Sequence, residues 1–349
     1  MKTAQVMLRE ATGLNLSKAV VDRAIKARMQ PSASADVASY LAAMTPDELT
    51  ALVELVVVPE SWFYRDAQAF QAMLDFIRQR SSNNAAARPV RILSIPCAGG
   101  EEPYTIAMVL ADAGLPPDSY SIEAYDISPA CIERARSGIY GRNAFRSSDL
   151  SFRERHFSSA GDDDYRISDA LRQQVRFRQG NLLEFDLSAR LGYFDVVFCR
   201  NLLIYFDQPT TQAAIKQLAA LLADDGLLFA GYAEVHSFCQ HGFAPLQHAQ
   251  AFGLRKESAA ARIAGAASQG ATRPPTRAQR ASAGRPQSPR AIPPPLQSAA
   301  SNPALVKPPA SELSPRPRRT AVTATATVAA TAAALAATPT DLLQLARLL

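Results

Sequence analysis

Residues 91–104 combine residue types that suit the binding of a positively charged small molecule. They read Arg91-Ile-Leu-Ser-Ile-Pro-Cys-Ala-Gly-Gly-Glu-Glu-Pro-Tyr104, which is an apolar run, a Pro/Gly turn and two carboxylates that open a helix. The turn lacks the spaced glycines that cradle a dinucleotide pyrophosphate. Acidic residues at such a turn favour a ligand that has no phosphate and carries a positive charge.

S-adenosylmethionine is a ligand of this kind, since it joins an adenosine to a sulfonium and an amino-acid group. A strand, a turn and a helix in this order form the first crossover of a nucleotide-binding α/β sheet. From residue 89 onward, strand-like and helix-like segments alternate, which predicts a mostly parallel sheet. Further strands are expected at 121–126, 194–199 and 227–231, and an antiparallel pair at 243–247 and 251–255.

Ligands of parallel sheets bind beyond the carboxyl ends of the strands. The residues expected there are 97–102, Asp126, Asn181 and 199–205. An acid that ends the second strand is typical of a ribose ligand, although Asp126 has the alternative of capping the next helix. Of the two adjacent acids, Glu101 is expected to serve the helix dipole and Glu102 the ligand.

The chain divides into four segments. Residues 1–80 read as an all-α domain, in which Thr45-Pro-Asp-Glu48 has the form of a helix start. The catalytic domain is expected at 88–256, with an insertion at about 138–174 that carries a small β-hairpin. Residues 257–338 are rich in Ala, Pro and Arg and lack apolar periodicity, which predicts a disordered linker. Residues 339–349 resemble the first helix of a longer domain.

Charge and cysteine usage limit the classes of function. The formal charge of +5 is uneven, because residues 1–255 hold 25 Lys/Arg against 29 Asp/Glu. An acidic folded part argues against nucleic acid as a partner. Four scattered cysteines, no signal-peptide core and no long apolar run predict a cytoplasmic protein with reduced thiols and no membrane insertion. The spacing of His236, Cys239 and His241 fits no zinc site, so no metal is expected.

Five sequence blocks occur in an order that is typical of one family. They are Ser61-Trp-Phe-Tyr-Arg-Asp66, Gly100-Glu-Glu-Pro-Tyr104, Ala135-Arg-Ser-Gly-Ile-Tyr140, Phe194-Asp-Val-Val-Phe-Cys-Arg-Asn-Leu-Leu-Ile-Tyr-Phe206 and Leu227-Leu-Phe-Ala-Gly-Tyr-Ala-Glu234. Over residues 5–255 the chain resembles the CheR-type chemotaxis-receptor methyltransferases. The Pro-rich linker and helical stub are similar to those of members that carry a C-terminal tetratricopeptide-repeat extension.

The resemblance implies an S-adenosylmethionine-dependent protein-glutamate O-methyltransferase with a Rossmann-like sheet. It implies that cofactor-binding residues are Ser61, Arg65, Glu102, Asp126, Asn181, Leu182, Cys199 and Arg200, and that Tyr205 lies next to the site of methyl transfer. Pro59 departs from the family, which often has Asn there, so a polar contact to the cofactor is in doubt. The implied partner is a methyl-accepting chemoreceptor-like protein, docked by the N-terminal domain, and the chain is expected to be a monomer.

Methyl transfer to a glutamate requires alignment rather than a base, because this side chain, with an ordinary pKa of about 4.3, is ionised at neutral pH. A guanidinium can hold a carboxylate by paired hydrogen bonds, and Arg65 is the predicted group. Tyr205 is the second predicted catalytic residue, as a wall that orients the carboxylate. Lys18, Arg23, Lys26 and Arg28 predict a basic helix that attracts an acidic receptor.

Structural alternatives remain open for these residues. Arg65 could instead form a structural ion pair, and Tyr205 could instead pack in the core. The basic helix could be an ordinary solvent-exposed helix face. Two other functions are also open. One is methylation of a small molecule or RNA, which the sheet alone allows. The other is a non-catalytic module that senses S-adenosylmethionine. The receptor, the methylated glutamates and the output of the pathway are not encoded in these motifs.

Overall fold

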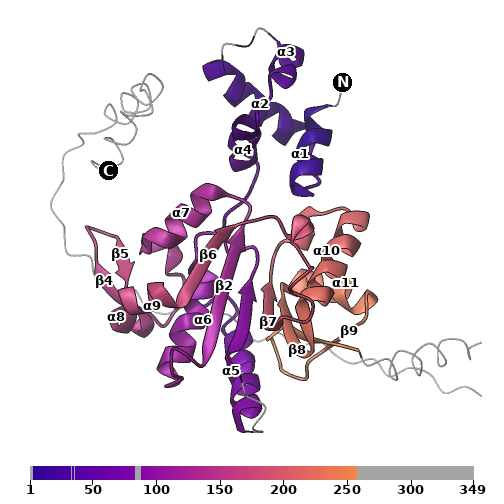
Figure 1. Ribbon diagram of the computed structural model, residues 1–349. Helices are drawn as coiled ribbons and strands as arrows, with labels where there is room; N and C mark the ends of the chain where they lie inside the picture. Colours follow the sequence, from indigo (N-terminus) through magenta and orange to yellow (C-terminus); the bar gives the residue numbers. More distant parts are fainter. Residues whose placement is uncertain (1–2, 33, 35, 83–87, 258–349) are drawn as a thin grey trace, which may run out of the picture. The chain divides into compact units, whose positions relative to one another are not determined.

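The structure, a computed structural model, describes residues 3–32, 34, 36–82 and 88–257 (Figure 1). The predicted linker after residue 257, the helical stub at 339–349 and the proposed repeat extension lie outside the described residues. No helix in the described part of the chain has the length and apolar character needed to cross a membrane.

Four short helices form the N-terminal part of the chain: α1 (Ala4–Thr12), α2 (Lys18–Ser32), α3 (Val37–Ala42) and α4 (Pro46–Glu54). The predicted start of α4 is confirmed, since the Thr45 side chain accepts a hydrogen bond from the Glu48 N–H and Pro46 occupies the first turn. Their apolar faces meet in one cluster, which includes Leu8, Ile25 and Leu52.

A seven-stranded sheet forms the body of the molecule, in the order β6-β2-β1-β7-β8-β10-β9. The strands are β1 (Val90–Ser94), β2 (Tyr120–Asp126), β6 (Val175–Gln179), β7 (Phe194–Cys199), β8 (Leu222–Ala230), β9 (Phe243–Pro245) and β10 (Gly253–Lys256). The first five strands of that order pair in parallel, and β10 pairs antiparallel with both β8 and β9. The prediction of a mostly parallel α/β sheet with a closing antiparallel pair is confirmed.

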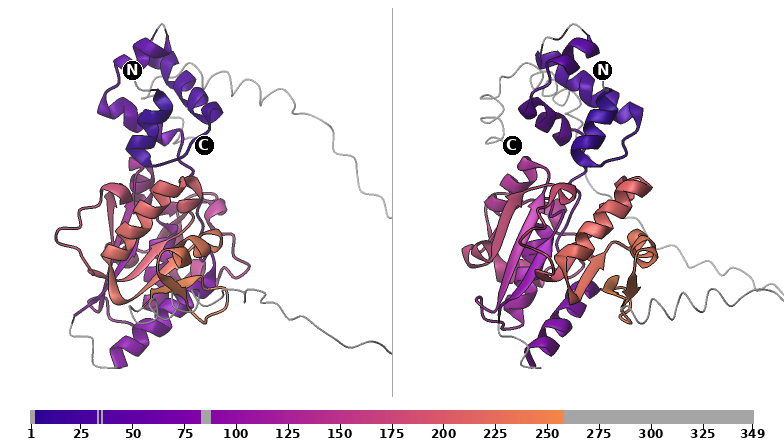
Figure 2. Two further views of the ribbon diagram at one scale, coloured as in Figure 1. Left: turned by 90° about the vertical axis from the view of Figure 1, so that its right-hand side faces the viewer. Right: turned by 45° about the vertical axis from the view of Figure 1, so that its right-hand side comes forward.

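Helices cover both faces of this sheet (Figures 1 and 2). Residues of α5 (Ala67–Ser82), α6 (Glu101–Asp112) and α7 (Pro129–Ser137) pack against one face, and residues of α10 (Gln208–Leu221) and α11 (Val235–Gln240) against the other. Neighbouring strand residues alternate between the two cores: Phe198 faces the first and Val197 the second. Helix α5 lies within the predicted 1–80 segment, yet its buried residues pack in the core of the sheet.

The insertion contains a small three-stranded sheet of β3 (Ile139–Tyr140), β4 (Phe157–Ser159) and β5 (Tyr165–Ile167), in the order β3-β5-β4. The hairpin β4–β5 was expected, and its acidic turn, residues 161–164, is exposed as predicted. The short helices η1 (Arg142–Ala144), α8 (Ser151–His156) and α9 (Asp169–Gln174) complete the insertion. Three further single turns, η2 (Leu182–Glu184), η3 (Leu203–Tyr205) and η4 (Tyr232–Glu234), follow strands of the main sheet.

Candidate active site

A cavity lies at the carboxyl ends of β1, β2, β6 and β7, where the sequence predicts a ligand site. We call it the main cavity. Eight of the nine predicted site residues line it: Ser61, Arg65, Glu102, Asp126, Asn181, Leu182, Arg200 and Tyr205. Cys199 does not, because its fully buried side chain points into the core beneath α10 and α11 together with Val197.

Asp126 is held at the end of β2 by two backbone N–H groups. Its Oδ2 accepts from Ala98 at 2.8 Å, and its Oδ1 accepts from Ser128 at 3.0 Å. Burial raises the pKa of this carboxyl, although both hydrogen bonds oppose that shift. Each oxygen has taken one donor and keeps the capacity for a second, which suits a pair of ribose hydroxyls.

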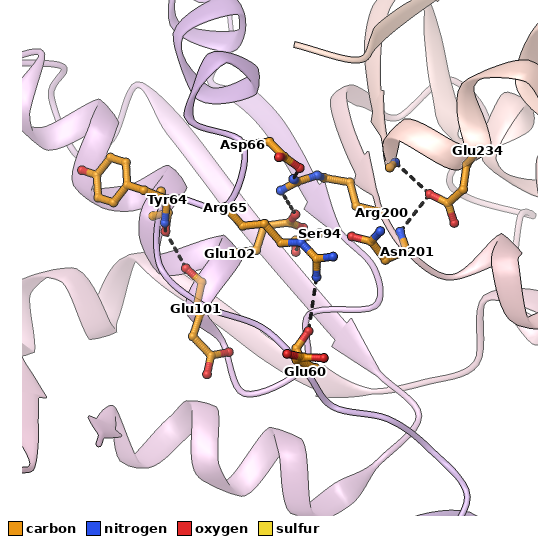
Figure 3. Close-up of polar contacts among 12 residues, drawn as sticks. Glu60, Tyr64, Arg65, Asp66, Ser94, Glu101, Glu102, Arg200, Asn201 and Glu234 are labelled. Carbon is orange, nitrogen blue, oxygen red and sulfur yellow. Dashed lines mark hydrogen bonds and ion pairs between the residues drawn. The ribbon is translucent and has the colours of Figure 1, made fainter. Parts of the chain in front are cut away.

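Glu102 lies opposite, in the first turn of α6. Its Oε1 accepts from the Ser94 hydroxyl at 2.8 Å, and its Oε2 lies 3.0 Å from the Arg200 guanidinium. Arg200 also pairs with Asp66, so this buried guanidinium lies between two carboxylates (Figure 3). Its Nε is buried and has no hydrogen-bond partner among the described residues. Ser94 and Asp66 had no predicted role, because the residues they contact are distant in the sequence.

Arg65 is half-buried at the edge of the main cavity. The residues on either side of it, Tyr64 and Asp66, have left-handed backbones with φ of 57° and 54°. Its Nη1 donates to the Glu60 carbonyl at 3.3 Å, and its guanidinium lies 4.3 Å from the centre of the Trp62 ring (Figure 3). Non-glycine residues rarely adopt this conformation, and such strain is concentrated at functional sites.

The charge of Arg65 is not neutralised by an ion pair within the described residues. Burial and the neighbouring Arg200 lower the pKa of its guanidinium, and nearby carboxylates only partly offset this effect. The structural ion pair considered above is therefore absent among those residues. A half-buried cation next to a second cation favours the binding of an anion.

Tyr205 ends the short turn η3 and is 38% exposed, so it is not a core residue. The loop that carries it is fixed by the buried carboxylate of Glu234. That carboxylate accepts backbone N–H groups of Gly231 at 2.7 Å, Asn201 at 2.8 Å and Leu203 at 2.6 Å. Glu234 thus joins the loops that follow β7 and β8. It belongs to the last of the five sequence blocks, residues 227–234, but the sequence analysis assigns it no role.

The side chain of Asn181 is already engaged within the protein. Its Oδ1 caps η2 by accepting the Leu183 N–H at 3.0 Å, and its Nδ2 donates to the Ala11 carbonyl at 3.0 Å. Contact of Asn181 with a ligand would therefore use its second Nδ2–H donor, its remaining acceptor capacity or its backbone. Leu182 is buried and supplies an apolar part of the wall, and half-buried Ser61 lies on the segment that leads to Arg65.

The end of α1 and the segment after it form one wall of the main cavity, which the sequence did not predict. Thr12, Leu14 and Leu16 line it. The Asn15 N–H donates to the Tyr205 carbonyl at 2.8 Å, and Leu14 forms an isolated antiparallel bridge with Phe206. The signal in the sequence is weak, because two apolar residues in a short loop are a common pattern.

The predicted basic helix corresponds to α2, but its four cations differ in their surroundings. Arg28 forms a two-point ion pair with Glu48, at 2.9 and 2.6 Å, inside the helical domain. Lys18 is exposed and lies 2.6 Å from Asp22 on the same helix. Arg23 and Lys26 are exposed. Docking by this helix stays a prediction that depends mainly on Arg23 and Lys26.

The groups that line the main cavity suit S-adenosylmethionine. Buried Asp126 offers acceptors for ribose hydroxyls, and Glu102 offers an acceptor for an ammonium group. Ile127 and Leu182 provide apolar surface for a flat heterocycle. Within the described residues, no cluster of His, Cys, Asp and Glu could hold a metal ion.

Comparison with known proteins agrees with this geometry. Residues 59–251 match the family model described as CheR methyltransferase, SAM binding domain. The chain is 43% identical over 272 residues to the "Probable biofilm formation methyltransferase WspC" of Pseudomonas putida, covering 76% of this chain and 64% of that protein. It is 37% identical over 185 residues to the "Chemotaxis protein methyltransferase" of Escherichia coli, covering 52% of this chain and 62% of that protein.

The chain thus spans less than two thirds of the length of these relatives, and the same holds for the WspC protein of Pseudomonas aeruginosa, of which it covers 62% at 43% identity. The matched region includes the strands and loops that form the main cavity, apart from the wall of Thr12, Leu14 and Leu16 and the lining residues 56–58. S-adenosylmethionine is the cofactor of this domain. The chain belongs to the CheR methyltransferase family, and its sheet has the S-adenosylmethionine-dependent methyltransferase fold.

Proposed function

We propose that this protein transfers a methyl group from S-adenosylmethionine to glutamate side chains of a chemoreceptor-like protein, forming glutamyl methyl esters. The observation that carries the proposal is Arg65, a half-buried guanidinium at the cavity edge without an ion pair among the described residues. A negatively charged acceptor compensates such a cation, whereas a neutral acceptor leaves only the carboxylate of the cofactor to do so.

The bound cofactor supplies an electrophilic methyl group on a sulfonium. In the proposed reaction, Arg65 holds the acceptor carboxylate and aligns one oxygen with the S–CH₃ bond. That oxygen attacks the methyl carbon as the C–S bond breaks, so a carboxylate and a sulfonium become an ester and a neutral thioether. No proton moves, and no general base is needed because a glutamate is ionised at neutral pH.

Other residues serve binding and orientation. The Asp126 carboxylate accepts hydrogen bonds from the ribose hydroxyls, and the Glu102 carboxylate accepts hydrogen bonds from the ammonium of the amino-acid group. Tyr205 lines the main cavity and is 38% exposed, and in the proposed reaction it contacts the incoming side chain. The apolar lining excludes water, which strengthens the attraction between Arg65 and a carboxylate.

The partner is proposed from the relatives' names and the chemistry of Arg65. Relatives named for biofilm formation and for chemotaxis both match the chain, so we propose that the methylated receptor controls one of these two responses. The proposed location is the cytoplasm, where the acidic helices of such a receptor would be accessible.

The test is methylation of receptors from the same cell with a labelled methyl donor. We expect label on glutamate residues, located by mass spectrometry, and release of the label by mild alkali. Label that survives alkali would contradict an ester product. Uptake that depends on added RNA would favour the alternative substrate class, and tight cofactor binding without turnover on any receptor would favour a sensor module.

A further inference from the structure

Trp62 is the single tryptophan of the chain, and two guanidinium groups lie over its ring. The central carbon of Arg65 is 4.3 Å from the ring centre, and that of Arg146 is 4.8 Å from it. The two carbons are therefore no farther apart than the sum of these distances, which is about 9 Å. Glu60, Trp62 and Arg65 line the main cavity, and Arg146 contacts the first two of them.

Arg146 comes from the insertion, just after η1, and is fixed in place by two acceptors. Its Nε donates to the Asn143 carbonyl at 3.1 Å. Its Nη1 lies 2.7 Å from Oε1 of Glu60. The side chain of Arg146 is 44% exposed and that of Glu60 is 59% exposed, so both remain accessible from solvent.

Glu60 contacts both cations in different ways. Its backbone carbonyl accepts from Arg65 at 3.3 Å, and its carboxylate pairs with Arg146 (Figure 3 shows the contact with Arg65). The hydrogen bond from Arg146 lowers the pKa of Glu60, which is therefore ionised at neutral pH. Exposed ion pairs of this kind are weak, so an external carboxylate is able to replace Glu60 at Arg146.

We propose that Trp62, Arg146 and Glu60 form a second acid-binding site at the mouth of the main cavity. Arg146 binds a second carboxylate of the substrate, on the same helical face as the methylated glutamate and one turn away. Glu60 occupies this position in the free enzyme and is displaced when the substrate binds. The inference rests on the proposed function for the identity of the first carboxylate, which binds Arg65.

The spacing of the two cations supports this geometry. Residues three or four apart on a helix have their Cβ atoms about 5–6 Å apart, and their carboxylates diverge from there. Two guanidiniums within about 9 Å of each other can therefore bind both carboxylates of such a pair. Arg142 differs, because it pairs with Asp163 of the hairpin turn and has no contact with Trp62 among the described interactions.

The test measures the binding of two helical peptides to the full chain loaded with S-adenosylhomocysteine. The first peptide carries a target Glu and a second Glu one turn away, and the other has Gln at the second position. Anisotropy of a label on the peptide gives Kd, and the fluorescence of Trp62 reports binding beside its ring. We expect the wild-type protein to bind the two-Glu peptide about 2- to 5-fold more tightly, the range of a partly exposed ion pair.

Three variants locate the effect. Arg146→Ala is expected to abolish the preference, so that both peptides bind equally. Glu60→Gln is expected to tighten binding of the two-Glu peptide several-fold, because it removes a competitor for Arg146. Arg142→Ala removes the same charge from the same insertion and is expected to leave the preference unchanged.

A charge-reversed combination of variant and peptide tests whether a loss of preference comes only from a perturbed fold. Arg146→Glu should prefer a peptide with Lys at the second position, and a reversal of preference requires a folded site. The inference is overturned if Arg146→Ala retains the wild-type preference, or if Glu60→Gln weakens binding of the two-Glu peptide.

The same experiment separates the inference from the proposed function. Methylation of the target Glu is measured on the same peptides. Methylation without a preference for the second Glu overturns the inference and leaves the proposed function standing. A preference that depends on Arg146 without any methylation supports the acid-binding site and counts against the proposed function.

Discussion

The carboxylate of Glu102 lies 3.0 Å from the guanidinium of Arg200, although the sequence assigns each of them separately to the cofactor. The pair joins the start of α6 to the end of β7, and Asp66 extends it to the segment that carries Arg65. Three elements that converge on the main cavity are therefore connected by one guanidinium. Removal of either acid would leave Arg200 with one carboxylate partner, so we expect the effects of the two removals to be coupled.

Glu102→Gln is expected to weaken binding of S-adenosylhomocysteine by about 1.5–3 kcal/mol, the contribution of a hydrogen bond to a charged group. The neutral amide keeps the shape but loses the attraction for an ammonium. Titration calorimetry measures the change. Glu133→Gln, on the exposed side of α7, is the matched control and should bind normally. An unchanged Kd for Glu102→Gln would remove this residue from the cofactor site.

Arg65→Ala is expected to abolish most methyl transfer and to leave cofactor affinity largely intact, because the guanidinium is proposed to hold the acceptor carboxylate. Single-turnover assays and calorimetry measure the two effects on the same preparation. A loss of cofactor affinity as large as the loss of transfer would assign Arg65 to the cofactor instead.

Asp126→Ala should show the opposite behaviour. We expect cofactor binding to weaken by about 1–3 kcal/mol, with transfer restored at saturating cofactor, because the lost contacts lie on the ribose. Two backbone N–H groups, those of Ala98 and Ser128, also lose their acceptor, so the melting temperature should fall. If Arg65→Ala and Asp126→Ala lose affinity equally, the assignment of separate roles is wrong.

Glu234→Gln is expected to destabilise the protein by about 2–3 kcal/mol. The two carboxylate oxygens accept three backbone N–H groups, and the amide must direct a donor toward at least one of them. Urea denaturation measures the loss. We also expect a reduced transfer rate, because Leu203 and the turn that ends at Tyr205 lose their anchor. Wild-type stability in this variant would contradict the assigned position of Glu234.

A fall in pH should destabilise the N-terminal helical part of the protein through protonation of Glu48. Its hydrogen bond with Arg28 lowers the pKa of Glu48 to about 2. A lowered pKa stabilises the folded state above the ordinary pKa of a glutamate, about 4.3, and this stabilisation disappears as the pH falls toward 2. Thermal unfolding at pH 6 and pH 3 should show a larger loss for wild type than for Glu48→Gln. An equal loss would mean that the ion pair does not contribute.

The sequence predicts the parts of this site that depend on short-range patterns. The acidic turn before α6 and the acid that ends β2 follow from the order of strand, turn and helix, and both Glu102 and Asp126 line the main cavity. The position of Cys199 was also predictable in principle. Side chains alternate along a strand, and Val197 on the same face is buried beneath α10.

Other features depend on contacts between distant segments, which periodicity does not reveal. Glu234 binds backbone groups of a loop that begins 33 residues earlier in the chain. Asn181 contacts the Ala11 carbonyl, 170 residues away. Arg28 has the sequence context of an exposed basic face, yet Glu48 neutralises it. In each case a polar group is satisfied by a partner that only the folded chain brings near.

The wall formed by Thr12, Leu14 and Leu16 has a practical consequence for dissecting this protein. The region shared with the family model starts at residue 59 and stops at residue 251, before β10. A fragment cut to those limits would lose one wall of the main cavity and β10, the strand that pairs with both β8 and β9. Inactivity of such a fragment would say nothing about receptor docking, so point changes on α2 are the cleaner way to study it.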